Sequence, residues 1–197
     1  SPLISFSHER FLKMISSCSK CQFDFSNDFF LIQVSIRRRR YTPVEGVDLI
    51  TLKDFVEATV NGKALNGTTP LQVVSRLQSL AAATEKAVQF LHNSVRTIGA
   101  ELDATASDLS VFAALGRYYA GKLCGATELG LYDATKDAAH KEKAVACLQE
   151  ALTHWREYTA LATAQYTYPQ LLARVALLDI EGFTENVQAD IRIAQEA

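Results

Sequence analysis

After Pro70, apolar and small residues recur at alternating steps of three and four along one continuous stretch. The series is Val74, Leu77, Ala81, Thr84, Val88, Leu91, Val95 and Ile98. Because an α-helix has about 3.6 residues per turn, this spacing places the series on one side of a helix, as in a bundle. Thr69, Pro70 and Gln72 supply a start signal, because they match an N-cap, a first-turn proline and a capping-box glutamine. The sequence predicts a helix over residues 70–98 that stops near Gly99.

The same rhythm predicts a second long helix. Its apolar residues are Leu109, Phe112, Tyr119 and Leu123, and Thr105 with Asp108 resembles a capping box at its start. Small residues form two rows at steps of four along it, with Gly116, Ala120 and Cys124 in one row and Gly121 and Gly125 in the other. Interior glycines lower helix stability, so we expect these rows to let a neighbouring helix approach closely.

A third long helix is predicted to begin near Asp137. Its inward residues are Val145, Leu148, Leu152, Trp155, Thr159 and Ala162. It should end before Tyr166, because Pro169 follows and the residue before a proline avoids helical backbone. Two shorter helices are predicted, one over residues 52–60 after an N-cap at Thr51 and one over residues 184–195.

Three long helices joined by short connections favour antiparallel neighbours. The predicted fold is therefore all-α: an antiparallel up-down bundle of three long helices plus shorter terminal helices, over residues 41–197. Residues 1–40 differ in composition, since they contain no alanine, against 27 alanines in the remainder, and carry seven basic and three acidic residues. We predict that they form a basic arm rich in Phe and Ser outside the core, poorly ordered or β-prone.

The arm permits two interpretations: a loose tail or a segment that touches a partner. Its run Arg37–Arg40 has no interleaved aromatic residues, and the net charge of −2 gives no general attraction to nucleic acid, so no nucleic-acid partner is expected. Its charges follow its apolar run, which does not match a signal peptide. No apolar run approaches the roughly 18 residues that a membrane span needs.

No catalytic signature is present: neither a Walker-type glycine loop nor the H-E-x-x-H and G-x-S-x-G patterns occur. Cys18 and Cys21 form a single C-x-x-C, which is short of the four ligands of a structural zinc site. Cys124 and Cys147 fall within helical patterns and are interpreted as small core residues. The three histidines of the helical region, His92, His140 and His154, have no ligand spacing. We therefore expect no metal, no cofactor and no catalytic residue.

The segment over residues 166–183 is the candidate binding site. Its candidate substrate-binding residues are Tyr166, Tyr168, Arg174 and Asp179, and Glu181 lies beside them. Tyrosine rings can pack on sugars, and arginine and carboxylates can hydrogen-bond sugar hydroxyls. The alternative is a helical turn over residues 171–178 that only packs on the bundle.

Three segments carry a resemblance to a known group of proteins: residues 41–48 (YTPVEGVD), 55–62 (FVEATVNG) and 66–70 (NGTTP). Residues 115–122 (LGRYYAGK), and later Trp155 and Asp179, continue it. Over residues 41–197 the chain resembles the carboxy-terminal helical region of large bacterial carbohydrate-active proteins, either α-glucuronidase-like glycoside hydrolases or carbohydrate-binding proteins.

The resemblance implies a non-catalytic helical accessory domain that packs beside a missing upstream catalytic barrel. It also implies an extracytoplasmic, periplasmic or secreted, location in a bacterium that degrades plant-type polysaccharide. Carbohydrate is then a possible ligand, and the parent protein would be the enzyme. The alternative is a free-standing helical module that binds another protein.

Overall fold

The computed structural model describes residues 48–94, 99–172 and 176–197. They form α3 (Leu52–Val60), α4 (Pro70–Ser94), α5 (Ala100–Thr135), α6 (Ala138–Gln165) and α7 (Thr184–Glu196), with a short hairpin of β1 (Gln170–Leu172) and β2 (Ala176–Leu178) before α7. The predicted all-α bundle of three long helices plus shorter ones is confirmed. The predicted basic arm, with Cys18, Cys21 and Arg37–Arg40, lies outside the described residues.

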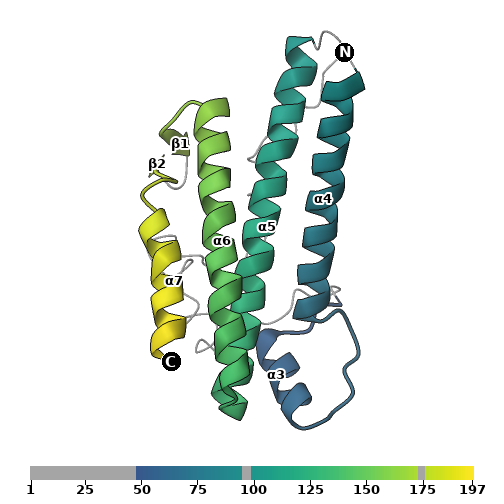
Figure 1. The fold of residues 1–197 in the computed structure, drawn as a ribbon, viewed down its shortest axis with the longest axis vertical. Helices are drawn as coiled ribbons and strands as arrows, with labels where there is room; N and C mark the ends of the chain where they lie inside the picture. Colours follow the sequence, from purple (N-terminus) through teal and green to yellow (C-terminus); the bar gives the residue numbers. More distant parts are fainter. Residues whose placement is uncertain (1–47, 95–98, 173–175) are drawn as a thin grey trace.

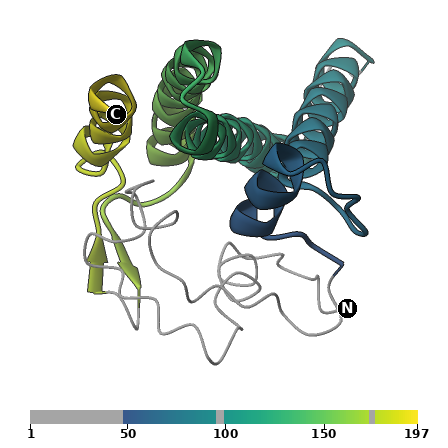
Figure 2. The same cartoon turned by 90° about the horizontal axis from the view of Figure 1, so that it is seen from below.

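The long helices alternate in direction and lie side by side in the order α4, α5, α6, with α7 beside α6 (Figure 1). Viewed from below, α4 lies at one edge of this array and α7 at the other, and α3 lies beside the lower end of α5 (Figure 2). The closest packing is between α5 and α6, followed by that between α4 and α5. The central helix α5 therefore organises the fold.

Local signals in the sequence set most helix starts. At α4, the Gln72 side chain accepts a hydrogen bond from the Thr69 amide at 2.8 Å and the Gln72 amide donates to the Thr69 hydroxyl at 3.2 Å, which is the predicted capping box. The Asp137 side chain caps α6 by accepting from the Ala139 amide at 3.0 Å. Thr51 caps α3 in the same way, through the Asp54 amide.

The predicted start of α5 at Thr105 is wrong, because the helix begins at Ala100 with Gly99 as its N-cap. Thr105 lies inside the helix, where its hydroxyl donates to the Glu101 carbonyl at 2.9 Å. A threonine one turn into a helix can bond to a carbonyl of the preceding turn as readily as it can cap. The acidic residues that follow Ala100, including Glu101, favour the positive N-terminal end of the helix dipole.

The inward series of α4 is oriented as predicted: Val74 and Ala81 are buried and Leu77, Thr84, Val88 and Leu91 are half-buried. Val95 and Ile98 lie outside the described residues. Because α4 packs mainly against one neighbour, α5, its series is less buried than the inward faces of α5 and α6.

The small residues of α5 let α6 approach. A Cβ atom on Gly121 would lie 2.9 Å from the Cys147 carbonyl oxygen, and one on Gly125 would lie 2.6 Å from Leu148. Gly130 plays the same part toward Val56 of α3, where a Cβ would lie 3.1 Å from a methyl carbon. Gly116 differs, because no described atom would lie within 4 Å of its Cβ. The close approach of α5 and α6 therefore depends on Gly121 and Gly125.

Cys124 of α5 and Cys147 of α6 form a disulfide, with their Cα atoms 5.9 Å apart. Both residues are half-buried, so they are not the small core residues that the sequence predicted. The pairing arises because Gly121 and Gly125 bring the two helices close on either side of Cys124. The bond therefore fastens α5 to α6 at their tightest contact.

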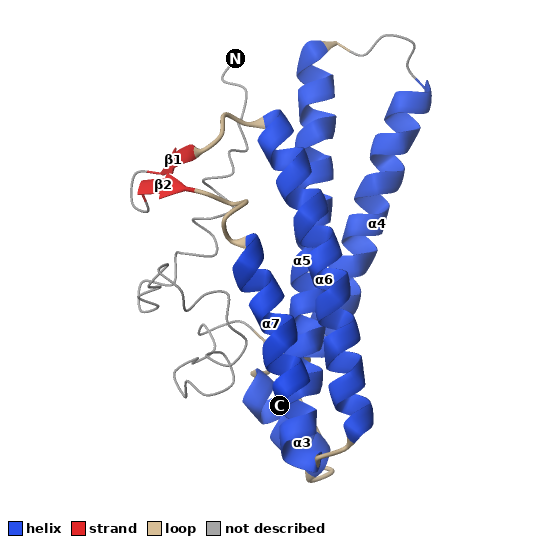
Figure 3. Ribbon diagram, turned by 60° about the vertical axis from the view of Figure 1, so that its left-hand side comes forward, coloured by secondary structure: helices blue, strands red, loops and turns tan. Residues whose placement is uncertain are grey.

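The alternative of a helical turn over residues 171–178 is wrong, because β1 and β2 pair antiparallel, with Gln170 opposite Leu178 and Leu172 opposite Ala176. Figure 3 shows this hairpin beside the end of α6. Pro169 holds the preceding residue in extended backbone and lacks an amide hydrogen, so α6 cannot continue through it. No described helix has the length and apolar content of a membrane span.

Candidate functional site

Tyr168 and Asp179 meet at the surface, where the hairpin leads back to the bundle. The Tyr168 hydroxyl donates a hydrogen bond to the Asp179 carboxylate, and it accepts one from the Glu181 amide at 3.2 Å. The Gly182 amide donates to the same carboxylate oxygen at 2.8 Å. These bonds fix the turn that precedes α7, and we call Tyr168 together with residues 179–182 the Tyr168 turn. Two of the four predicted binding residues are thus in direct contact.

The electrostatics of this turn follow from the hydrogen bonds. The bonds from Tyr168 and then from the Gly182 amide hold the pKa of Asp179 below its ordinary value, because they stabilise the charged carboxylate. Desolvation and the bond to Asp179 raise the pKa of Tyr168. At neutral pH the turn therefore presents a neutral phenol held by an exposed, ionised carboxylate.

Tyr166 belongs to a different group. Its hydroxyl donates to Asp108 of α5 at 2.7 Å, and the Gln165 side chain donates to the Ala104 carbonyl at 3.3 Å. Burial and the hydrogen bond to Asp108 raise the pKa of Tyr166. This group attaches the end of α6 to the upper part of α5. The fourth candidate, Arg174, lies outside the described residues.

The Tyr168 turn offers a ligand both polar groups and an aromatic ring. The Tyr168 ring packs against the main core cluster, and its hydroxyl edge is held by Asp179 at the surface. Asp179 and Glu181 are both exposed and can accept hydrogen bonds from hydroxyl groups. The described part of the chain brings no group of three or more metal-binding side chains together.

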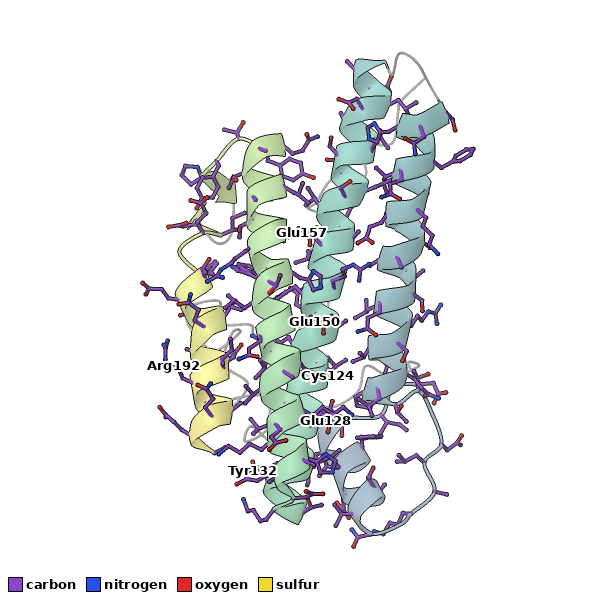
Figure 4. All side chains as sticks on the ribbon, viewed as in Figure 1. Cys124, Glu128, Tyr132, Glu150, Glu157 and Arg192 are labelled. Atoms are coloured by element: carbon purple, nitrogen blue, oxygen red, sulfur yellow. A yellow bond between two sulfur atoms is a disulfide. The ribbon has the colours of Figure 1, made fainter. Side chains whose placement is uncertain are left out.

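Charged residues missed by the sequence analysis connect α5 to the other long helices. Arg117 binds Glu85 of α4 through two hydrogen bonds of 2.6 Å each. Glu128, only 1% exposed, binds His140 at 2.7 Å and Lys143 at 2.6 Å, both on α6. Figure 4 labels Glu128 low on α5, near Cys124. The burial of Glu128 could have been predicted from the sequence, because it is the one charged residue in the run of small and apolar residues 125–131.

The third connection joins α5 to α7. The Lys122 ammonium lies 2.9 Å from a carboxylate oxygen of Asp190. Burial lowers the pKa of Lys122, and the nearby Asp190 carboxylate partly offsets this shift. The same ammonium lies 5.9 Å from the centre of the Tyr118 ring. Each ion pair thus ties α5 to a different helix.

His154 is the second histidine of α6, and it too was not expected to be a metal ligand. It lies between two carboxylates of its own helix. Its Nδ1 is 3.1 Å from Glu157 and its Nε2 is 3.7 Å from Glu150. Both carboxylates face the side of α6 seen in Figure 4. His92, on α4, is exposed.

Part of the core is a cluster of aromatic rings from α5 and α6. The ring centres of Tyr118 and Trp155 are 4.8 Å apart, and those of Trp155 and Tyr158 are 5.3 Å apart. Burial raises the pKa of Tyr119 and of Tyr158 to about 12. The Trp155 indole donates to the hydroxyl of Thr184, the first residue of α7, at 3.2 Å. The aromatic cluster therefore supports both α7 and the Tyr168 turn.

A pocket of about 350 Å³ lies between α3 and the lower end of α5. Its walls include Leu52, Val56 and Val60 of α3 and Gly130 and Ala134 of α5. It is apolar, and it does not adjoin the predicted binding residues. No family model, curated protein or solved structure matches this chain.

Proposed function

We propose that this chain is a non-catalytic helical accessory domain of a glycoside-hydrolase-type protein that acts on plant-type polysaccharide. In this role it packs beside an upstream catalytic barrel, and the Tyr168 turn contacts glycan at the edge of the active site. The proposal begins from the resemblance of residues 41–197 to the helical region of carbohydrate-active proteins.

The observation that carries the proposal is the way in which the structure supports the Tyr168 turn. The disulfide and the ion pairs of Arg117, Lys122 and Glu128 link α5 to three other helices, α4, α6 and α7. The turn lies where α6, the hairpin and α7 meet. A rigid frame that presents one tyrosine–carboxylate pair suits positioning a glycan better than it suits proton transfer to a substrate.

The proposed glycan contact follows from the exposed groups of that turn. Sugar hydroxyls can donate to Asp179 and Glu181, and a sugar ring can pack on the exposed part of Tyr168. Arg174 is part of the proposal as a further donor, on sequence grounds.

An extracytoplasmic location is also part of the proposal. Its support is the Cys124–Cys147 disulfide, because such bonds form and persist mainly in oxidising compartments. The resemblance points to the same location.

Affinity electrophoresis of the full chain in gels that contain plant polysaccharides, glucuronoxylan among them, tests the glycan contact. We expect retardation by at least one polysaccharide, loss of retardation in Tyr168→Ala, and no change in Tyr132→Ala, a control near the far end of α5. Retardation by none of the polysaccharides would overturn the glycan contact.

Two further measurements test the remaining parts. Reducing-sugar assays of the full chain on the same polysaccharides should show no release, and sugar release by this chain alone would overturn the non-catalytic role. The reading frame directly upstream should encode a barrel, and co-purification of that barrel with this chain would support the packing. An unrelated upstream reading frame would count against it.

The second candidate function is a helical module that binds another protein. The observation that favours it is the exposure of large apolar side chains on α4, with Leu80 57% and Phe90 73% exposed. This function predicts association without any affinity for carbohydrate.

A further inference from the structure

The outer side of α4 carries a second apolar series, distinct from the inward series that packs on α5. Its members are Leu80, Ala83, Ala87 and Phe90, all of them exposed. Their steps of three, four and three place them on one side of the helix. We call this set the outer stripe. Phe90, at 73%, is the most exposed of the large apolar side chains in the described part of the chain.

The outer stripe has the same spacing in both chain directions. Position 85 lies midway between Leu80 and Phe90, and it also lies midway between Ala83 and Ala87. When two α4 helices pack antiparallel about that level, Leu80 of one copy meets Phe90 of the other, and Ala83 meets Ala87. The alanines at the centre let the backbones approach, and the larger side chains fill the space on both sides. Such self-complementarity is what a two-fold interface requires.

The charges near the two ends of α4 favour the same arrangement. Arg76 extends the outer stripe by one turn and is exposed. Glu101 and Asp103 lie in the first turn of α5, beside the opposite end of α4 (Figure 1). An antiparallel pair brings Arg76 of each copy toward the acidic end of the other, whereas a parallel pair would place the basic ends together.

We propose that the outer stripe is a contact between two copies of this chain, which pack α4 against α4 antiparallel about the level of position 85. This dimer goes beyond the accessory role and does not depend on it. A contact of one helix from each copy is at the small end of specific interfaces, so the association should be weak and depend on concentration.

Sedimentation equilibrium of the full chain, from micromolar to near-millimolar concentration, tests the contact. The chain should pass from monomer to dimer, and Phe90→Glu should weaken the dimer at least about tenfold, because it places a charge against Leu80 of the other copy in a buried part of the contact. Gln89→Glu is the matched control, since it adds the same charge at an exposed neighbouring position off the stripe and should leave the dimer intact. A monomer at all concentrations, or a dimer that survives Phe90→Glu, would overturn the proposal.

The direction of packing has its own test. Leu80→Lys and Phe90→Glu should each be monomeric alone, and an equimolar mixture should form a heterodimer, because position 80 of one copy then meets position 90 of the other. A mixture that stays monomeric would overturn the antiparallel arrangement. Both substitutions are at exposed positions, so circular dichroism should show unchanged helix content. A monomer that instead binds a separate domain through this stripe would also overturn the proposed second copy.

Discussion

Lys122 of α5 and Asp190 of α7 form an ion pair with 2.9 Å between nitrogen and oxygen, in which the lysine side chain is 16% exposed and the aspartate 1% exposed. Two opposite charges are thus held almost out of contact with water. Removing one partner leaves the other as a buried charge, and this is far more costly than removing both. The pair therefore adds a buried electrostatic contact to the packing of α7 on α6.

We expect Asp190→Ala to lower the free energy of unfolding by about 3–5 kcal/mol, because Lys122 stays buried without its carboxylate. Urea denaturation followed by circular dichroism measures this change. The double variant Lys122→Met with Asp190→Leu removes both charges and should recover most of the loss. A loss below about 1 kcal/mol for Asp190→Ala would show that the pair is dispensable.

Acid should weaken the contact between α4 and α5. Hydrogen bonds from Arg117 hold the pKa of Glu85 below its ordinary value of 4.5. The unfolded chain then binds more protons than the folded chain in the range below 4.5, so stability is lost as pH falls through the folded pKa. The melting temperature should fall more steeply below that pH in the parent chain than in Glu85→Gln. Equal slopes in the two proteins would contradict the role assigned to this pair.

Reduction of the disulfide should destabilise the bundle without abolishing it. Cys124 and Cys147 are separated by 23 positions, and closing a loop of that length in the unfolded chain corresponds to about 3 kcal/mol. Urea denaturation with and without a reducing agent measures the difference. The Cys124→Ala, Cys147→Ala variant is the control, because its stability should match that of the reduced chain and should not respond to the reducing agent.

The two glycines Gly116 and Gly121 should respond in opposite directions to alanine. Gly116→Ala places its methyl group in open space and should stabilise the protein by about 0.5–1 kcal/mol through helix propensity. Gly121→Ala places a methyl group 2.9 Å from the Cys147 carbonyl oxygen, so α6 must move and stability should fall. Thermal denaturation of both variants checks the contrast, and a stabilised Gly121→Ala would mean that the helices are not in close contact there.

The helices were predictable because their signals are local. Thr69 with Gln72 and Asp137 each cap a helix through residues two or three positions away, which a sequence shows directly. Thr105 also lies in a local pattern, but its hydroxyl has a competing carbonyl one turn back, at Glu101, and the pattern was misleading. The hairpin was missed because its two strands are too short to show an alternating pattern.

The candidate site was predictable only in part. Tyr168 and Asp179 are 11 positions apart within one connection, so their meeting could be expected. The partner of Tyr166 is Asp108, which lies 58 positions away on another helix, and no local pattern indicates such a pair. The ion pair between Lys122 and Asp190 was missed for the same reason, since the two residues lie on separate helices and only the folded bundle brings them together.

Because α4 lies at the edge of the bundle, we expect it to unfold locally more readily than the central helix α5. Most of its inward series is only half-buried and it packs mainly on α5, whereas α5 is held by neighbours on several sides. Backbone amides of α4 should therefore exchange their hydrogens with solvent before those of α5, and within α5 those near Gly121 and Gly125, beside the disulfide, should exchange last.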